Sequence, residues 1–358
     1  MHKDDSMTPK ERMAAYFRGD PVDRIPTNLF LSAVGPELLG MTLRETRRDP
    51  RKEAFVQVEC YKLLGCDGLG INYGLHGVGN ALGSKLSDPE NAPPSVAEFV
   101  LKDLKDMDTL DISKVERRND PKLNRHYEAG EMMLEQVGDE CDIGVAICGP
   151  FTAASSLYPT SSLLRAVRRD PETVHRLLRF CTECIKIVCS ELAPLGVSFM
   201  LCDPVASGTI LRKAEYLEFV SPYTCELVEA IHALGVPANY HICGDTTSLV
   251  DSMVDTGIDG LSIDNIVDLH GVREKVGERV CIVGNVDPVD VMLNGTPDDI
   301  DAAVLRCLDQ AQDSPCGYVL AQGCEIPVST PRENVFRFME AARRYGKGAE
   351  KGRPRLAV

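Results

Sequence analysis

Short hydrophobic runs alternate with longer amphipathic segments along almost the whole chain. Continuous hydrophobic runs between helices are typical of parallel strands that are buried on both faces. Half-exposed strands would instead alternate polar and apolar positions. The pattern predicts eight strands, within residues 24–32, 67–74, 142–150, 197–204, 237–245, 257–265, 280–288 and 317–327.

Helix start and stop signals fill the segments between these runs. Thr8, Pro9 and Glu11 predict a capping box with proline at the first helical position, ahead of the first strand. The segment 170–196 predicts a long amphipathic helix, and 245–257 predicts a short helix that begins directly after the fifth strand. Further helices are predicted over 221–235 and 329–346.

The repeating order of strand and helix predicts an α/β protein, a (β/α)8 TIM barrel with an N-terminal helical extension. An open doubly wound sheet is the alternative. We expect a single barrel domain over residues 1–358, in which 75–141 forms a rim insertion between the second and third strands. Barrels of this type reach the length of this chain as one domain.

The composition argues against a nucleic-acid-binding protein, a membrane protein and a disulfide-stabilised secreted protein. The chain has 358 residues, is 44% hydrophobic and carries a net charge of −15 without a long basic run, so we expect no nucleic-acid partner. It has no hydrophobic run long enough to span a bilayer and no apolar signal region, so we expect a cytoplasmic protein without a membrane partner. Fourteen scattered cysteines in a long chain indicate reduced thiols rather than a disulfide framework.

The fifth hydrophobic run ends in a histidine and a cysteine that are separated by one residue, His241 and Cys243. Residues i and i+2 of a strand point to the same face, and the chemistry of a barrel lies at the C-terminal ends of its strands. Taken alone, the pair favours core packing over metal binding, because cysteine is often buried and a metal needs more ligands.

A third potential ligand, Cys324, follows the eighth run after the flexible residue Gly323. If the fifth and eighth strands face one barrel mouth, His241, Cys243 and Cys324 converge there. One histidine and two cysteines suit Zn²⁺ and leave a fourth tetrahedral position open, which is typical of catalytic zinc. Such a site binds a thiol as its thiolate and favours alkyl transfer to sulfur over activation of water.

Other polar residues at strand ends are candidates for contact with the substrate. We predict that Asp203 orients His241 or contacts substrate, with a helix cap as the alternative role. His76 lies in a glycine-rich loop that either approaches a large flat ligand or is only a rim loop. Asn285 is predicted to reach into the mouth, and Asp245 to cap a helix whose dipole favours an anionic group there.

The motifs together carry a family resemblance. The stretches "HICGD", "GNVDP", "GCEIPVSTPRENV" and "KERMAAYFRGDPVDRIP" resemble the uroporphyrinogen decarboxylase superfamily over nearly the whole chain. The His-x-Cys motif with the distal cysteine is similar to its methylcobamide:coenzyme M methyltransferase branch. The resemblance implies a (β/α)8 barrel in which His241, Cys243 and Cys324 hold the zinc that activates the coenzyme M thiol.

The resemblance further implies a zinc-dependent methyltransferase that moves a methyl group between a corrinoid protein and a thiol such as coenzyme M. Position 273 in "DLHGVR" is Arg, where the corrinoid-ligand motif D-x-H-x-x-G has Gly. We therefore expect methylcobamide on a partner protein.

Three alternatives remain: a demethylase of a small methylated substrate that loads a corrinoid, a uroporphyrinogen decarboxylase-like enzyme, and a non-catalytic zinc- or thiol-binding protein. The decarboxylase is disfavoured, because "NLFLSAVGPELLG" has no arginine where decarboxylases carry a "MRQAGR"-type segment for substrate carboxylates.

Overall fold

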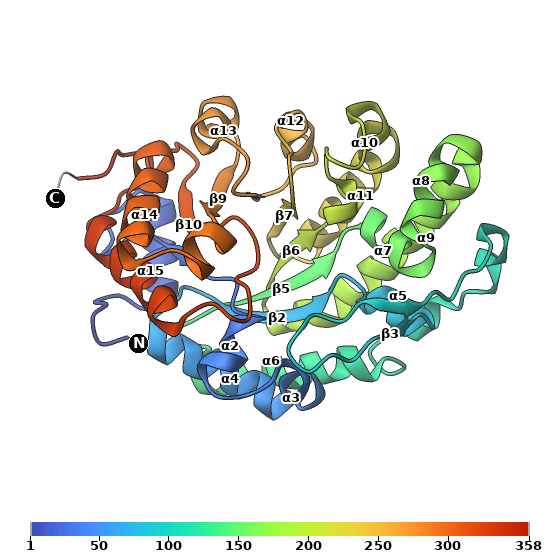
Figure 1. Cartoon of the computed structure of the whole chain (residues 1–358), viewed down its shortest axis with the longest axis horizontal. Helices are drawn as coiled ribbons and strands as arrows, with labels where there is room; N and C mark the ends of the chain where they lie inside the picture. The colour runs from blue at the N-terminus through green and yellow to red at the C-terminus, as the bar shows by residue number, and fades with distance from the viewer. Residues whose placement is uncertain (1, 357–358) are drawn as a thin grey trace.

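The computed structural model describes residues 2–356, and its centre is a sheet of eight parallel strands (Figure 1). Each strand lies within one of the eight hydrophobic runs, so the predicted strand order is confirmed. The strands are β1 (Thr27–Asn28), β2 (Leu69–Gly74), β5 (Ile143–Cys148), β6 (Ser198–Cys202), β7 (Ala238–Ile242), β8 (Gly260–Ile263), β9 (Cys281–Val286) and β10 (Tyr318–Gln322).

The order of the strands in the sheet is that of a (β/α)8 barrel. Hydrogen-bonded neighbours run β1-β10-β9-β8-β7-β6-β5-β2, so strands that follow one another in the chain lie side by side. A doubly wound sheet would instead reverse its order at a switch point. The predicted TIM-type fold is confirmed, as a curled half-barrel whose first two strands, β1 and β2, stand at the two ends of the hydrogen-bonded order.

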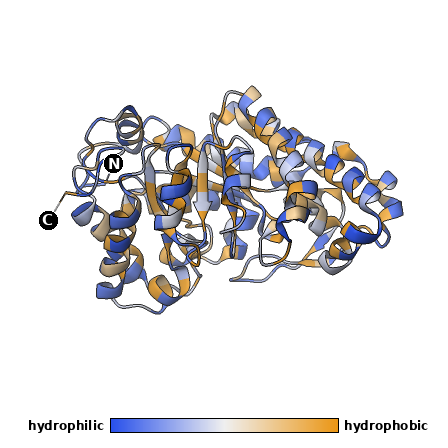
Figure 2. Cartoon of the chain, turned by 90° about the horizontal axis from the view of Figure 1, so that it is seen from above, coloured by the Kyte–Doolittle hydropathy of each residue, from blue (hydrophilic) through white to orange (hydrophobic). Residues whose placement is uncertain are grey.

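Helices surround the outside of the strands, and hydrophobic and hydrophilic residues are interleaved along them (Figures 1 and 2). The α-helices are α1 (Pro9–Arg18), α2 (Val34–Leu38), α3 (Leu43–Arg48), α4 (Pro50–Leu64), α5 (Gly77–Leu82), α6 (Pro121–Val137), α7 (Pro150–Leu157), α8 (Thr160–Arg169), α9 (Pro171–Leu192), α10 (Lys213–Phe219), α11 (Ser221–Ala233), α12 (Val250–Val254), α13 (Leu269–Val276), α14 (Pro297–Ala311) and α15 (Arg332–Tyr345). No helix in the described part of the chain is long and apolar enough to cross a bilayer.

Most predicted helix starts agree with the structure. Thr8 and Glu11 form the expected capping box at α1, and Asp170 caps α9. The helix predicted to begin at Asp245 is wrong, because α12 begins only at Val250. The exposed Asp245 carboxylate accepts a hydrogen bond from the backbone N–H of Thr247 at 2.9 Å, and such local bonds compete with helix formation.

The segment predicted as a rim insertion, 75–141, contains short elements and one long helix. The short elements are α5, the hairpin of β3 (Lys85–Leu86) and β4 (Val96–Glu98), and the 3-10 helices η1 (Leu104–Thr109) and η2 (Ile112–Val115). The long helix α6 packs on β2 and α4, so it is the crossover helix that leads to β5. The organisation as a single domain stays a prediction.

Side chains bridge the two ends of the sheet, β1 and β2. Asp67, which precedes β2, accepts a hydrogen bond from the backbone N–H of Thr27 in β1 at 2.7 Å and one from Arg24 Nη1 at 2.6 Å. Arg12 of α1 also pairs with Asp67. Both guanidinium groups are fully buried, so this seam depends on charged side chains rather than on a backbone ladder.

We predict that Asp67→Ala destabilises the protein strongly, by about 3–5 kcal/mol, because it leaves two buried guanidinium groups short of a carboxylate. Urea denaturation followed by circular dichroism measures the change in the free energy of unfolding. The matched control is Asp20→Ala, whose exposed pair with Arg18 should contribute less than about 1 kcal/mol. Equal losses in the two variants would contradict the role of the seam.

Candidate metal centre

Three side chains meet where β7 and β10 end. His241 is the last residue but one of strand β7, Cys243 follows that strand, and Cys324 comes two residues after β10. His241 Nε2 lies 3.1 Å from Cys243 Sγ, which lies 3.4 Å from Cys324 Sγ. Among residues 2–356 this is the one group of three or more His, Cys or carboxylate side chains whose ligand atoms all lie within 4.8 Å of one another. The predicted convergence is confirmed.

Two glycines allow the cysteines to take these positions. Gly244 follows Cys243 with φ +85°, a left-handed conformation, and its N–H donates to Asp264 Oδ2 at 2.7 Å. Gly323 precedes Cys324, and a side chain there would collide with the backbone of Asn265. The loop after β8, which holds Asp264 and Asn265, therefore anchors both cysteine-bearing turns.

The imidazole is oriented by a neighbouring strand. His241 pairs in register with Ser262 of β8, and His241 Nδ1 lies 3.1 Å from Ser262 Oγ. If Nδ1 carries the ring hydrogen, it donates a hydrogen bond to Ser262 Oγ, and Nε2 is left free to bind a metal. The ring is buried, 5% exposed, and its centroid lies 6.3 Å from that of Phe30.

The two thiols have opposite acid–base properties. The hydrogen bond to Cys324, together with burial, raises the pKa of Cys243 far above its usual range. The hydrogen bond from Cys243, and a further one from His241, lower the pKa of Cys324 despite its burial. The two sulfurs thus affect each other's pKa in opposite directions, and a cation bound between them would replace their hydrogen bond.

This donor set fits a zinc ion. Two cysteine sulfurs and one imidazole nitrogen are ligands that Zn²⁺ prefers, and three protein ligands leave one tetrahedral position for a substrate. The ligand atoms already face one another, and Ser262 supplies the outer hydrogen bond that metal-binding histidines usually make.

Two of the predicted catalytic residues, Asp203 and Asn285, form hydrogen bonds that hold neighbouring segments of the fold in place. Asp203 does not reach the His241 ring: its carboxylate accepts hydrogen bonds from the N–H and hydroxyl of Thr152, in the first turn of α7. Burial raises the pKa of Asp203 to about 6. The amide of Asn285 donates to the carbonyls of Asp264 and Val267, so it ties a loop down instead of reaching into the mouth.

His76, which was predicted, and Glu325, which was not, also lie near the strand ends. His76 precedes α5, directly after β2, and its Nδ1 is buried without a hydrogen-bond partner among the described residues. Glu325 follows Cys324, and its carboxylate accepts hydrogen bonds from Ser32 Oγ and the Ala33 N–H, both at 2.8 Å. Burial raises the pKa of Glu325 to about 7.

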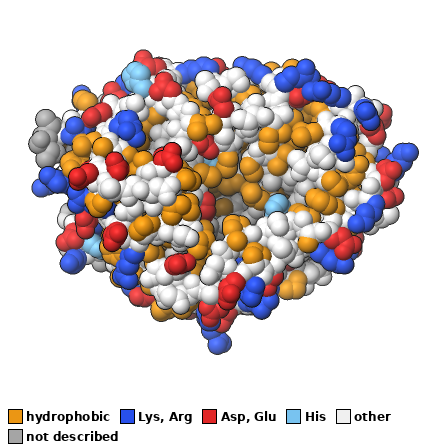
Figure 3. Space-filling view, in the orientation of Figure 1, with side chains coloured by type: hydrophobic (Ala, Val, Ile, Leu, Met, Phe, Trp, Pro, Cys, Tyr) orange, Lys and Arg blue, Asp and Glu red, His pale blue; other side chains and the backbone are white. Residues whose placement is uncertain are grey.

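The barrel interior is open on one side. Alternate residues of β2, β5 and β6 are partly exposed, whereas β8, β9 and β10 are buried throughout. The partly or fully exposed positions on β2 and β5 include Gly70, Asn72 and Gly144. Figure 3 shows this face of the molecule hollowed near its centre and lined largely by hydrophobic side chains.

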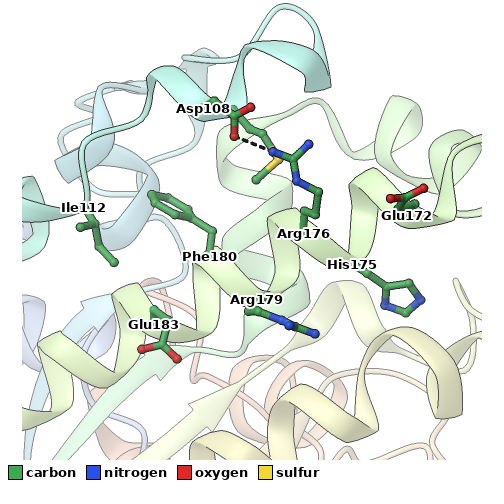
Figure 4. A pocket seen from close by; sticks show the side chains of 9 residues that line it. Asp108, Ile112, Glu172, His175, Arg176, Arg179, Phe180 and Glu183 are labelled. Atoms are coloured by element: carbon green, nitrogen blue, oxygen red, sulfur yellow. Dashed lines mark hydrogen bonds and ion pairs between the residues drawn. The ribbon is translucent and has the colours of Figure 1, made fainter.

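A separate surface cavity of about 520 Å³ lies over α9, η1 and η2 (Figure 4). Its charged side chains have mixed signs, and Arg176 pairs with Asp108 at 2.6 Å. It is lined by Met107, Asp108, Ile112, Glu172, His175, Arg176, Arg179, Phe180 and Glu183. The helix α9 covers the outside of the barrel, so this cavity is remote from the strand ends that carry the cluster.

Comparison with known proteins agrees with this geometry. Residues 8–345 match the family model described as uroporphyrinogen decarboxylase (URO-D). The chain belongs to the uroporphyrinogen decarboxylase family. Within this family, it is 29% identical over 343 residues to the methylcobamide:CoM methyltransferase MtbA of Methanosarcina acetivorans, covering 94% of this chain and 98% of the relative.

Other members of the uroporphyrinogen decarboxylase family extend the comparison. A methylated-thiol–coenzyme M methyltransferase of Methanosarcina mazei is 25% identical, covering 94% of this chain and 89% of the relative. The solved structure of a methyltransferase from Methanosarcina mazei superimposes with a TM-score of 0.81 at 26% identity, covering 95% of this chain and 99% of that one. These likenesses indicate a methyltransferase.

The sequence did not reveal Ser262 or Asp264, although "GLSID" places both at the end of the sixth predicted strand. Only the register between β7 and β8 brings Ser262 beside His241. If the pairing of β7 with β8 had been known, Ser262 could have been predicted as a neighbour of His241. Directly paired residues of adjacent strands point to the same side of the sheet.

We predict that Ser262→Ala weakens zinc binding about 10- to 100-fold, because the imidazole loses the hydrogen bond that sets its orientation. Competition with a chromophoric chelator measures the affinity. Ser190→Ala is the control, since that hydroxyl bonds only to a carbonyl of its own helix on the surface. Unchanged affinity in Ser262→Ala would exclude Ser262 as the orienting group.

Proposed function

We propose that the chain is a zinc-dependent methyltransferase that acts between a methylcobamide, carried by a partner corrinoid protein, and a small thiol. The observation that carries this proposal is the meeting of His241, Cys243 and Cys324, with contacts of 3.1 and 3.4 Å, beside the open half of the barrel. The relatives named methylcobamide:CoM methyltransferases support the same reaction.

The three side chains would hold the zinc, and each has a defined task. Bound zinc supplies an open position at which the substrate thiol is held as its thiolate. Cys243 and Cys324, as thiolates, balance the charge of the dication, so the substrate sulfur keeps its nucleophilic character. His241 would bind the metal through Nε2, since Ser262 Oγ, 3.1 Å from Nδ1, can accept a hydrogen bond from an Nδ1–H group.

The transfer balances without any further reactant. A lone pair on the substrate sulfur forms the new S–C bond, while the electron pair of the Co–C bond stays on cobalt. The products are a methyl thioether and a cob(I)amide, and the proton of the thiol leaves to solvent. The protein contributes by positioning the two reactants and by keeping the sulfur deprotonated.

The reverse use of the same site is a second candidate. A methylated thiol or another small methylated substrate would then lose its methyl group to cob(I)amide. The likeness to a methylated-thiol–coenzyme M methyltransferase favours testing it. Incubation with cob(I)alamin and a methyl thioether, compared with methylcobalamin and a thiol, separates the two directions by their cobalamin absorption spectra.

We predict that Cys324→Ala abolishes thiol methylation and lowers the zinc content of the protein, while the fold is retained. Cys184→Ala is the matched control, because Cys184 is fully buried within α9 and should affect stability but not zinc or activity. Metal analysis, circular dichroism and the methylcobalamin assay give the three results. Full activity of Cys324→Ala would contradict the proposal.

We also predict that a thiol releases about one proton when it binds to the zinc-loaded protein at pH 7, because a free alkyl thiol is mostly protonated there. Calorimetry in buffers of different ionisation enthalpy counts this proton. The Cys324→Ala variant should show no such release. Binding by the zinc-loaded wild type without proton release would mean that the thiol is not held as its thiolate.

A further inference from the structure

The segment that carries Cys324 has few backbone contacts. The ladder between β10 and β9 ends at the pair of Gln322 and Val286, and the N–H of Gly323 donates to the Val286 carbonyl at 2.8 Å. Beyond this bond, no backbone N–H of residues 324–329 donates to a backbone carbonyl in the part of the chain that the structure describes. The backbone alone therefore does not fix the position of Cys324, because a loop with unpaired backbone groups opens easily.

The side chain of Glu325 supplies an anchor for this segment. Its Oε1 accepts hydrogen bonds from Ser32 Oγ and from the Ala33 N–H, both at 2.8 Å. Ala33 directly precedes α2 and makes no side-chain cap, so the carboxylate pairs an N–H at the start of this helix. Hydrogen bonds to an ionised carboxylate are stronger than bonds between neutral groups, which suits this role as an anchor.

Ser32 is in turn held from the other end of the sheet. The amide of Asn72 in β2 donates to Ser32 Oγ at 2.9 Å. A hydroxyl has a single hydrogen, and Ser32 can direct it to Glu325 because its oxygen accepts from Asn72. The three side chains therefore link β2, the turn after β1 and the segment after β10, at the seam where β1 and β2 share no backbone ladder.

A carboxylate anchors each of the two cysteine-bearing turns. Asp264 accepts from the N–H of Gly244, the residue after Cys243, at 2.7 Å. Glu325, the residue after Cys324, reaches the turn after β1 with its own side chain. Its carboxylate is not in the group of ligand atoms that lie within 4.8 Å of one another. Glu325 can therefore act on the metal centre through the position of Cys324, without being a ligand.

We propose that Glu325 is a positioning residue of the metal centre, whose hydrogen bonds to the turn after β1 hold Cys324 beside Cys243 and His241. The inference rests on the proposed zinc site and extends it to a residue that does not touch the ion. Without this anchor, metal binding would have to order residues 324–329, and ordering a loop on binding lowers the affinity.

The test measures metal binding rather than activity. Competition with a chromophoric chelator should show that Glu325→Ala binds zinc about 10- to 100-fold more weakly, as is typical when a metal ligand loses its outer support. Glu325→Gln should retain most of the affinity, because its side-chain oxygen can still accept both hydrogen bonds. Ser32→Ala removes one of the two bonds from the other side and should cause a smaller loss.

A second measurement reports on the sulfur itself. In protein loaded with Co²⁺ in place of zinc, thiolate ligands give a charge-transfer absorption in the near ultraviolet. This absorption should fall in Glu325→Ala towards that of Cys324→Ala, because the Cys324 sulfur is no longer held at the metal. Glu325→Gln should keep the absorption of the wild type. A role in stability alone would not change this spectrum in folded protein.

Asp301→Ala is the matched control. Asp301 is also a half-buried carboxylate with two partners, since it accepts from the Tyr345 hydroxyl at 2.8 Å and pairs with Arg337 at 2.5 Å. These groups join the outer helices α14 and α15, so the variant should lose stability but keep the zinc affinity and the cobalt spectrum. Circular dichroism verifies that each variant is folded.

The outcomes separate this inference from the proposed function. Unchanged affinity and spectrum in Glu325→Ala, or an equal loss of affinity in Asp301→Ala, would overturn the positioning role and leave the zinc site intact. A loss in Glu325→Gln as large as that in Glu325→Ala would also overturn it, since the hydrogen bonds could not be the cause. A wild type that binds neither zinc nor cobalt would instead contradict the proposed function, and the positioning role with it.

Discussion

The carboxylate of Asp67 closes the seam on which the arrangement of the site depends. The hydrogen-bonded order of the strands ends at β1 and β2, and Asp67 connects these ends through Thr27 and Arg24. Since β1 pairs with β10, the seam also supports the strand that leads to Cys324. Buried charges are costly unless they are paired, so this network gives the closure a specific geometry.

The strands differ in how far they are buried, in a barrel where side chains rather than backbone hydrogen bonds join β1 to β2. Alternate residues of β2, β5 and β6 are partly exposed, whereas β8, β9 and β10 are buried throughout. A small separate hydrophobic cluster, formed by Cys281, Val283, Val319 and Ala321 with Phe30 beside it, accounts for part of the packed side. Of the strands that lead to the cluster, β7 stands between the partly exposed β6 and the packed β8, and β10 belongs to the packed side.

The family supplies the barrel, and the residues at the strand ends determine the chemistry. A decarboxylase of this family needs cationic groups for several carboxylates, but the stretch after the first strand has no arginine. Here the ends of β7 and β10 carry one imidazole and two sulfurs, from His241, Cys243 and Cys324. This set suits the proposed activation of one thiol.

Local patterns in the sequence were sufficient for much of the protein. The eight strands follow from hydrophobic runs, and the position of His241, Cys243 and Cys324 at or just after strand ends was enough to predict that they meet. Their role as zinc ligands remains a proposal. These predictions succeeded because they depend on periodicity and on the common polarity of parallel strands, which short stretches of sequence contain.

Only the tertiary structure decided the partners of these residues. Ser262 rather than Asp203 faces the His241 ring, because strand register brings residues from different strands together. Asp203 instead holds the first turn of α7, and the turn at Asp245 replaces the expected helix start. Such contacts join positions far apart in the chain or depend on competition between local hydrogen bonds, and neither leaves a periodic signal in the sequence.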